Sequence, residues 1–159
     1  VCSSDLVFGC GHYDQHRDDV VYTHCADEFE LVDKFLDLWT QYYPDAITGW
    51  NINFFDIPYL MNRIKRLFGD EKIAKFSPWG KVNAREVEFK SKKQVVYEIM
   101  GVAMLDYYEM YRKFSSNPNQ ESYKLDYIAN VELGEKKLDY SQYGNLHQLY
   151  KNNYQKFIE

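Results

Sequence analysis

Residues 48–59 read TGWNINFFDIPY and contain the most informative change of pattern in the chain. The apolar run that leads into this segment, residues 46–50, has the length and composition of a short buried strand. A polar, aromatic loop follows, and Pro58 then occupies the position that helices favour for their first residue. An apolar stripe of helical spacing continues until Gly69. The sequence therefore predicts a strand, a loop and a helix in that order.

The residues before this segment predict two short strands and a helix. Residues 6–10 and 20–23 are β-prone runs joined by a polar connection, which suits the edge of a meander. Asp27 followed by Glu30 has the spacing of a capping box, and apolar residues then fall on one helical face until Pro44. We expect this helix to pack on the rest of the fold.

The residues after the segment continue the alternation of strands and helices, without a repeat or a low-complexity linker. This order predicts an α/β fold in which a mixed sheet carries helices on its faces. The expected elements are a hairpin of residues 86–90 and 95–99 around Ser91-Lys92-Lys93, a strand at 102–105, helices at 106–114 and near 125–129, and a last helix from about Leu146 to the end.

Composition indicates one globular domain or part of one. The chain has 159 residues, of which 45% are apolar and 18% aromatic, enough for one sizeable core. No stretch approaches the roughly 18 uninterrupted apolar residues of a membrane span, so we expect no membrane association. The net charge of −5 argues against binding nucleic acid through a uniformly basic surface. A local patch remains, because residues 81–93 hold five basic and two acidic side chains.

The three cysteines, Cys2, Cys10 and Cys25, form an odd set without the spacing of a disulfide framework. Free thiols in a reducing compartment are the simplest interpretation. A zinc site is the alternative, since three histidines lie near two of these cysteines, but paired-ligand spacing is missing. The histidines concerned are His12, His16 and His24.

The segment at 48–59 resembles the second exonuclease motif of family B DNA polymerases of the tailed-phage replicative type. The shared features are a glycine, an aromatic residue and Asn51, a short spacer, and then phenylalanine with Asp56 before a proline-tyrosine pair. The resemblance covers roughly residues 20–159 and continues in the same order downstream. The further matching segments are Met61-Asn-Arg-Ile64, Phe76-Ser-Pro-x-Gly80, Leu105-Asp-Tyr107, Tyr111-x-Lys-Phe114 and Ser122-Tyr-x-Leu125.

The resemblance implies that residues 1–159 form part of a proofreading 3′→5′ exonuclease domain, cut at both ends, of a larger DNA-directed DNA polymerase. The implied fold is ribonuclease-H-like, a mixed sheet with flanking helices and an inserted β-hairpin. Phage-encoded polymerases of this type work in the host cytoplasm. The implied partners are the single-stranded 3′ end of primer DNA, template-primer DNA, the rest of the polymerase chain and a sliding clamp.

Phosphodiester hydrolysis explains why an aspartate stands in this motif. Two divalent ions about 4 Å apart activate water and hold the charge that gathers on the leaving oxygen. Ions of this hardness prefer carboxylates, and the resemblance implies two Mg2+ or Mn2+ ions in the complete domain. Asp56 is therefore the expected catalytic residue and metal ligand. The alternative is that Asp56 only caps the helix that begins at Pro58.

The same resemblance implies a set of residues that grip DNA. An asparagine amide can donate to phosphate or sugar, and an aromatic face stacks a base without reading sequence. Of Phe54 and Phe55 we expect one to belong to the core. The hairpin is implied to help move the primer end between the polymerising and editing sites, although a plain surface hairpin fits the sequence nearly as well. The expected DNA-binding residues are Asn51, Phe55, Tyr59, Lys92, Lys93 and Tyr123.

The chain departs from the family pattern at two of three acidic motifs. It contains no Asp-x-Glu and no Tyr-x3-Asp, the first and third motifs. We expect both to lie in the flanking sequence and the 159 residues alone to be inactive. Asp106 could be a second metal ligand because it ends a predicted strand. The spacing of Asp106 and Glu109 instead favours a helix cap.

Two other functions stay open on sequence alone. One is a stand-alone ribonuclease-H-like exonuclease without a polymerase. The other is a catalytically silent nucleic-acid-binding domain that kept the fold and lost its acidic residues. The presence of Asn51, Phe55 and Asp56 together counts against the silent domain.

Overall fold

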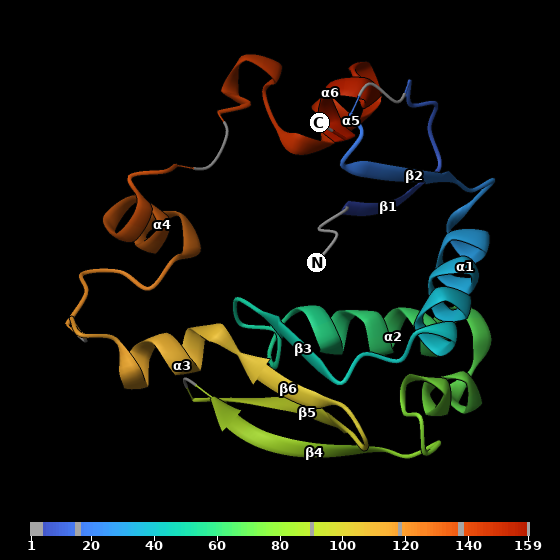
Figure 1. Ribbon diagram of the computed structural model, residues 1–159, viewed down its shortest axis with the longest axis horizontal. Helices are drawn as coiled ribbons and strands as arrows, with labels where there is room; N and C mark the ends of the chain where they lie inside the picture. The colour runs from blue at the N-terminus through green and yellow to red at the C-terminus, as the bar shows by residue number, and fades with distance from the viewer. Residues whose placement is uncertain (1–4, 15–16, 90, 118, 137–138, 159) are drawn as a thin grey trace. The chain divides into compact units, whose positions relative to one another are not determined.

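The computed structural model describes residues 5–14, 17–89, 91–117, 119–136 and 139–158 (Figure 1). The chain divides into two compact units, residues 1–35 with 136–159 and residues 36–135. Both units combine strands with helices, so the expected α/β class is confirmed. No described helix has the length and apolar character that crossing a membrane requires.

The first unit contains a parallel pair of strands, β1 (Asp5–Gly9) and β2 (Val20–His24). The expected meander is wrong, because neighbouring strands of a meander run antiparallel. The connection between the strands returns the chain to the start of β1 before β2 begins. A hydrogen bond from the Asp5 amide to the Asp19 oxygen, 2.7 Å long, marks this return.

Helix α1 (Glu28–Gln41) begins as the sequence predicts and includes residues of both units. The Asp27 carboxylate accepts the Glu30 amide at 2.9 Å, and the Glu30 carboxylate accepts the Ala26 amide at 2.5 Å. The capping box is thus confirmed, with its return bond one residue earlier than usual. The hydrogen bond from the Ala26 amide lowers the pKa of the Glu30 carboxyl below its ordinary value, and the hydrogen bond with Lys34 lowers it further.

The C-terminal residues of the first unit form a short 3-10 turn, η2 (Ser141–Tyr143), and two helices, α5 (Leu146–Asn152) and α6 (Tyr154–Ile158). The single last helix expected from the sequence is therefore wrong. Asn153 interrupts it with an extended φ of −148°, and the Asn153 side chain accepts the Lys156 amide at 3.0 Å. Asparagine favours this capping role over a helix interior.

Helix α6 contacts the strand pair within the first unit. The Tyr22 hydroxyl donates to the Gly11 oxygen at 2.6 Å and lies 3.0 Å from the Tyr154 hydroxyl. Gln155 accepts the Asp14 amide and donates to the Asp14 oxygen, both at 2.9 Å. These bonds join residues near the two ends of the chain into one unit.

The second unit is built around a parallel pair, β3 (Ala46–Gly49) and β6 (Ala103–Asp106). The register places Gly49 opposite Asp106, so both strands end at the same edge. The predicted strands at 46–50 and 102–105 are confirmed to within one residue. The loop after β3 and the helix after β6 therefore begin side by side.

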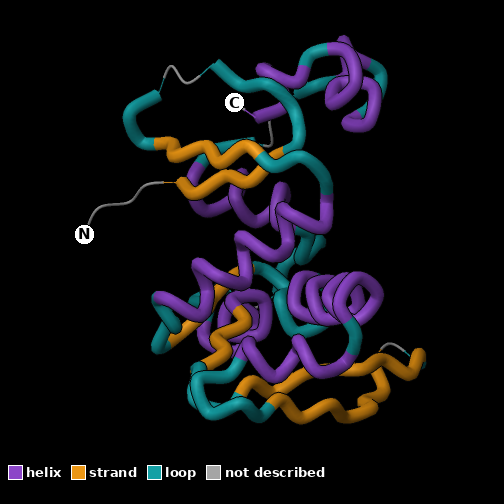
Figure 2. Tube along the Cα trace, turned by 90° about the vertical axis from the view of Figure 1, so that its right-hand side faces the viewer, coloured by secondary structure: helices purple, strands orange, loops and turns teal. Residues whose placement is uncertain are grey.

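The predicted hairpin is confirmed and is longer than expected. Strands β4 (Val82–Phe89) and β5 (Lys92–Ile99) run antiparallel, and Figure 2 shows them side by side in orange. Lys92 and Lys93 belong to β5, which corrects their expected place in the turn. The described strands form three two-stranded sheets and not the single mixed sheet expected.

Helix α2 (Asp56–Phe68) supplies much of the core of the second unit. Ile57, Met61 and Ile64 lie on one helical face and are buried, as the apolar spacing requires. Phe76 is also buried, and its oxygen accepts the Trp39 indole N–H at 2.9 Å. The other helical elements of this unit are η1 (Asp70–Phe76), α3 (Tyr107–Phe114) and α4 (Leu125–Leu133).

Replacing Ile64 by alanine should destabilise the fold. Ile64 is fully buried, and truncation of such a side chain costs about 2–5 kcal/mol of unfolding free energy because a cavity remains. Urea unfolding followed by circular dichroism measures the loss. Asn62→Ala on the exposed face of α2 is the matched control and should leave the midpoint nearly unchanged. Equal midpoints for the two variants would contradict the observed packing of α2.

Candidate functional site

The loop between β3 and α2 is a tight turn that starts with an unusual backbone conformation at Asn51. Asn51 has a φ of +66°, the left-handed region, which asparagine tolerates better than most residues. Its oxygen accepts the amides of Phe54 at 3.2 Å and Phe55 at 3.1 Å. A Cβ on Gly49 would lie 2.6 Å from the Ile52 side chain, so glycine is required there. Sequence reasoning gave Asn51 a DNA contact and missed this backbone role.

Asp106 joins the loop to the rest of the second unit. Its side chain is buried, and Oδ1 accepts the amides of Asn51 and Tyr108, each at 3.0 Å. Oδ2 accepts the amide of Asn53, also at 3.0 Å. The helix-cap interpretation is thus confirmed through Tyr108, and the carboxylate oxygens are engaged with backbone N–H groups. The return bond from Glu109 is not found among the described hydrogen bonds.

The bonds from Asp106 to the loop were not predicted. Asp106 and Asn51 are far apart in the sequence and meet only because β6 pairs with β3. The available signal was the prediction that both residues follow parallel strands, since parallel strands present their carboxyl ends at one edge.

Asp56 is the first residue of α2 and is exposed. The cap position belongs to Phe55, and the part of the chain that the structure describes shows no hydrogen bond to the Asp56 side chain. The alternative that Asp56 caps this helix is therefore wrong. Pro58 is the third helical residue and not the first, a position where its missing N–H still costs nothing. The Asp56 carboxylate is available to an external partner.

Two aromatic side chains flank the exposed aspartate. Phe55 is 65% exposed and Tyr59 is 57% exposed. Phe55 is the N-cap of α2 and Tyr59 follows four positions later, so both lie at the first turn of this helix. The expectation that Phe54 or Phe55 belongs to the core is wrong, because Phe54 is only half-buried and Ile52 fills the core position. Asp56, Phe55 and Tyr59 thus share the exposed start of one helix.

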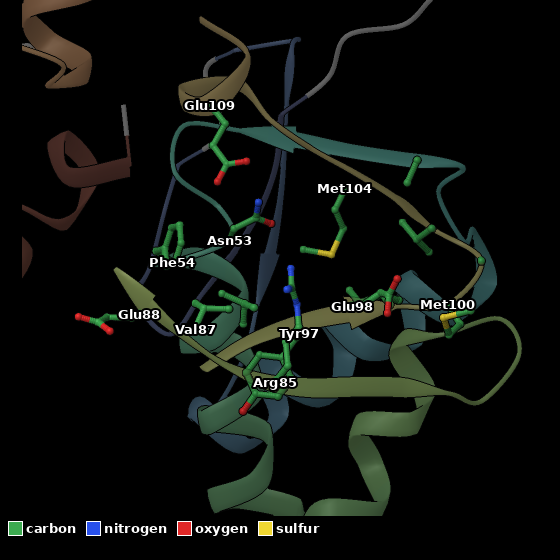
Figure 3. Close-up of a pocket in the computed structure, with 15 residues that line it drawn as sticks. Asn53, Phe54, Arg85, Val87, Glu88, Tyr97, Glu98, Met100, Met104 and Glu109 are labelled. Atoms are coloured by element: carbon green, nitrogen blue, oxygen red, sulfur yellow. The ribbon is translucent and has the colours of Figure 1, made fainter. Parts of the chain in front are cut away.

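A hollow of about 680 Å³ lies between the loop and the hairpin within the second unit. Figure 3 shows the side chains of Asn53, Arg85, Met104 and Glu109 directed into it. Its lining comes from the loop, from both hairpin strands, from β6 and from α3. The loop therefore borders open space on the side of the hairpin.

Tyr123 lies in an aromatic cluster of the second unit and is half-buried. Its backbone oxygen accepts the Trp50 indole N–H at 3.2 Å, and the Arg112 guanidinium carbon lies 5.2 Å from its ring centre. Its contact with DNA stays a prediction. The other rings of the cluster, Tyr107, Tyr108 and Tyr111, have centres within 6.1 Å of the Trp50 ring centre.

Lys92 and Lys93 are exposed near the tip of the hairpin. As successive strand residues they point to opposite faces of it. Lys93 lies 3.9 Å from the Glu86 carboxylate, but these side chains are 85% and 70% exposed, so the pair contributes little to stability. Their positive charges remain accessible to a partner.

Comparison with known proteins identifies the chain. A family model described as DNA polymerase family B, exonuclease domain, matches residues 8–128. The chain belongs to this family. It is 38% identical to the DNA-directed DNA polymerase of Escherichia phage RB69 and 36% identical to that of Enterobacteria phage T4, each over 141 residues. These alignments cover 89% of the chain and 15% of each phage polymerase.

A more distant relative matches a shorter part of the chain. The DNA polymerase catalytic subunit of Elephantid herpesvirus 1 is 34% identical over 117 residues, which cover 71% of this chain and 11% of that subunit. The chain thus spans about 15% of the length of its phage relatives and less of the herpesvirus protein. These relatives are named as DNA polymerases, and the family model for the exonuclease domain matches residues 8–128 of this chain.

Exonuclease domains of family B polymerases depend on divalent metal ions, and the donor set of this chain can be compared with that need. Asp56 fits one ligand position, because its exposed carboxylate has no hydrogen bond among the described residues. No group of three His, Cys, Asp or Glu side chains in the described part of the chain could hold an ion. The role of Asp56 as a metal ligand therefore stays a prediction.

The cysteines of this family member do not resemble metal ligands in the described residues. Cys10 and Cys25 are free thiols. Burial, and after it the neighbouring Asp27, raises the pKa of the Cys10 thiol, and burial raises the pKa of the Cys25 thiol. No group of three possible metal ligands that includes a cysteine is found among the described residues. Cys2 and His16 lie outside the described residues.

Replacing Phe55 by alanine should weaken the grip on a single-stranded 3′ end without unfolding the domain. The ring is mostly exposed, so its removal leaves no cavity. Stacking of one base on an aromatic ring contributes about 1–3 kcal/mol, and the dissociation constant for an oligothymidylate should rise accordingly. Fluorescence anisotropy measures it.

Tyr42→Ala is the matched control for Phe55→Ala, because Tyr42 is 66% exposed in the same unit and lies outside the motif. Its affinity for the oligonucleotide should match that of the unsubstituted protein. An unchanged dissociation constant in Phe55→Ala would remove Phe55 from the DNA-binding residues.

Proposed function

We propose that this chain is the proofreading 3′→5′ exonuclease region of a DNA-directed DNA polymerase and has a ribonuclease-H-like fold. The observation that carries the proposal is the exposed Asp56 carboxylate, presented at the start of α2 within the segment that the family model matches. Its position after a strand of a parallel pair is where ligand sites of α/β folds cluster. The substrate is the single-stranded 3′ end of primer DNA.

The residues of this chain divide the task between holding and hydrolysing the strand. Asp56 would supply one carboxylate to the metal site, and Mg2+ or Mn2+ held there would supply the activation of water and the stabilisation of the leaving 3′ oxygen. The side-chain amide of Asn51 donates to the phosphate or sugar of the terminal nucleotides. Phe55 and Tyr59 stack bases, which tolerates any sequence, as proofreading requires.

The other acidic ligands come from Asp-x-Glu and Tyr-x3-Asp segments of the same polymerase, outside these 159 residues. The isolated chain is therefore inactive, and the rest of the polymerase is its obligatory partner. A sliding clamp is the further partner proposed for the complete polymerase. The similarity to phage polymerases supports a location in the host cytoplasm. Template-primer DNA reaches this region through the hairpin, whose lysines meet its phosphates.

Replacing Asp56 by alanine in the complete polymerase should abolish proofreading and preserve synthesis. Loss of one electrostatic group of this kind lowers turnover about 10²–10³-fold. Asp56 is exposed and makes no described side-chain bond, so stability should not change. Gel assays of oligonucleotide degradation in magnesium and of mismatch extension measure both activities. Asp56→Asn should behave like Asp56→Ala, because asparagine keeps the shape and loses the charge.

The matched control for Asp56→Ala is Asp45→Ala, an exposed aspartate just before β3 rather than after it. It should retain full exonuclease activity. Normal hydrolysis in both Asp56 variants would contradict the proposal and favour a silent nucleic-acid-binding domain. Hydrolysis without any associated nucleotide addition would favour a stand-alone exonuclease.

Replacing Lys92 and Lys93 together by alanine should slow excision from a primer-template duplex and leave excision from single strands nearly unchanged. Each lost phosphate contact lowers the salt dependence of duplex binding by about 0.9 in log-log slope. Rapid-quench excision and salt titration of binding measure the two effects. Glu86→Gln removes only the weak ion pair with Lys93 and should change neither. Equal loss on both substrates would exclude a role in strand transfer.

A further inference from the structure

Asp106 is hydrogen-bonded to the loop that precedes Asp56, the expected catalytic residue. It is 4% exposed, and its two oxygens accept three backbone amides at 3.0 Å each. Two of these amides, Asn51 and Asn53, belong to the loop, and only Tyr108 belongs to the helix that Asp106 caps. A cap needs one such bond, so two bonds are unexplained by capping.

Hydrogen bonds within the loop connect the residues held by Asp106 to the start of α2, where Asp56 lies. The Asn51 oxygen accepts the Phe54 and Phe55 amides, and the Ile52 oxygen accepts the Ile57 amide at 3.1 Å. Fixing the backbone at Asn51 and Asn53 therefore fixes the first turn of α2. Asp56 lies within that turn.

We propose that Asp106 is a positioning residue for the exonuclease reaction, whose buried carboxylate holds the Asn51–Asn53 backbone so that Asp56 and Phe55 face the DNA end together. The inference rests on the proposed function. Asp106 acts through the loop backbone, because two of the amides that its carboxylate accepts belong to the loop. Its effect is to remove conformational freedom from the loop before DNA arrives, which preserves reactive geometry.

The arrangement of the three bonds distinguishes positioning from capping. Asparagine and aspartate are equally good N-caps. In Asp106→Asn, Oδ1 can keep both the Tyr108 and Asn51 amides, but the new NH2 group faces the Asn53 amide, and two donors repel. If the side chain flips, the Asn53 bond returns and the other two are lost. The first orientation keeps two bonds, so the cap survives and the loop loses one anchor.

The experiment compares Asp106→Asn with the unsubstituted protein in the complete polymerase. Exonuclease kcat on single-stranded DNA should fall about 10- to 100-fold, the usual effect of losing an outer group that orients a ligand. Hydrogen exchange followed by mass spectrometry should show faster exchange in residues 51–55. Exchange in 107–114 should stay unchanged, because the cap of α3 is intact.

Asp27→Asn is the matched control, since Asp27 also caps a helix and is exposed outside the loop. It should leave kcat and both exchange profiles unchanged. Normal kcat in Asp106→Asn would overturn the proposal. Faster exchange throughout α3 together with lost activity would also overturn it, because the cap and not the loop would then be the cause.

Asp56→Ala separates failure of this inference from failure of the proposed function. If Asp56→Ala keeps exonuclease activity, the proposed function is wrong, and the exchange data alone report whether Asp106 anchors the loop. If Asp56→Ala is inactive while Asp106→Asn is fully active, the proposed function stands and the positioning role is excluded.

Discussion

The loop before α2 depends on the hydrogen bonds that its backbone donates to the carboxylate of Asp106. Burying a carboxylate is costly unless its oxygens are hydrogen-bonded, and here backbone amides from two segments satisfy them. The backbone N–H groups of Asn51 and Asn53 in turn need hydrogen-bond acceptors, and the carboxylate provides them. Loop and carboxylate therefore stabilise each other.

The parallel pairing of β3 with β6 makes that contact available. Both strands end at one edge, so the loop that follows β3 meets the residue that ends β6. The hairpin of β4 and β5 is inserted between α2 and β6 in the sequence, yet it leaves this pairing intact. The insertion also places hairpin side chains beside the loop, around the hollow that Arg85 and Asn53 share. The loop before α2 and the β4–β5 hairpin are thus neighbours around this hollow.

Local patterns predicted the elements, and their pairing escaped sequence reasoning. The strand, loop and helix around Asp56 follow from apolar spacing, and the capping box at Asp27 follows from two residues. The direction of β2 depends on the path of its connection, which no local pattern encodes, so the meander was wrong. The Asp106 bonds depend on pairing between distant strands. Asp56 is exposed, and its role as a site residue stays a prediction, because no group of three His, Cys, Asp or Glu side chains that could hold a metal ion is found among the described residues.

The left-handed backbone at Asn51 restricts which residues can occupy that position before any DNA contact is considered. Most L-residues pay about 1–2 kcal/mol for this conformation, whereas glycine, asparagine and aspartate adopt it more readily. Glycine has no side chain to offer a phosphate, and aspartate would repel one. Asparagine combines an accessible left-handed backbone with a neutral donor. A substitution at Asn51 therefore has two separate requirements to meet, the left-handed backbone and the proposed contact with DNA.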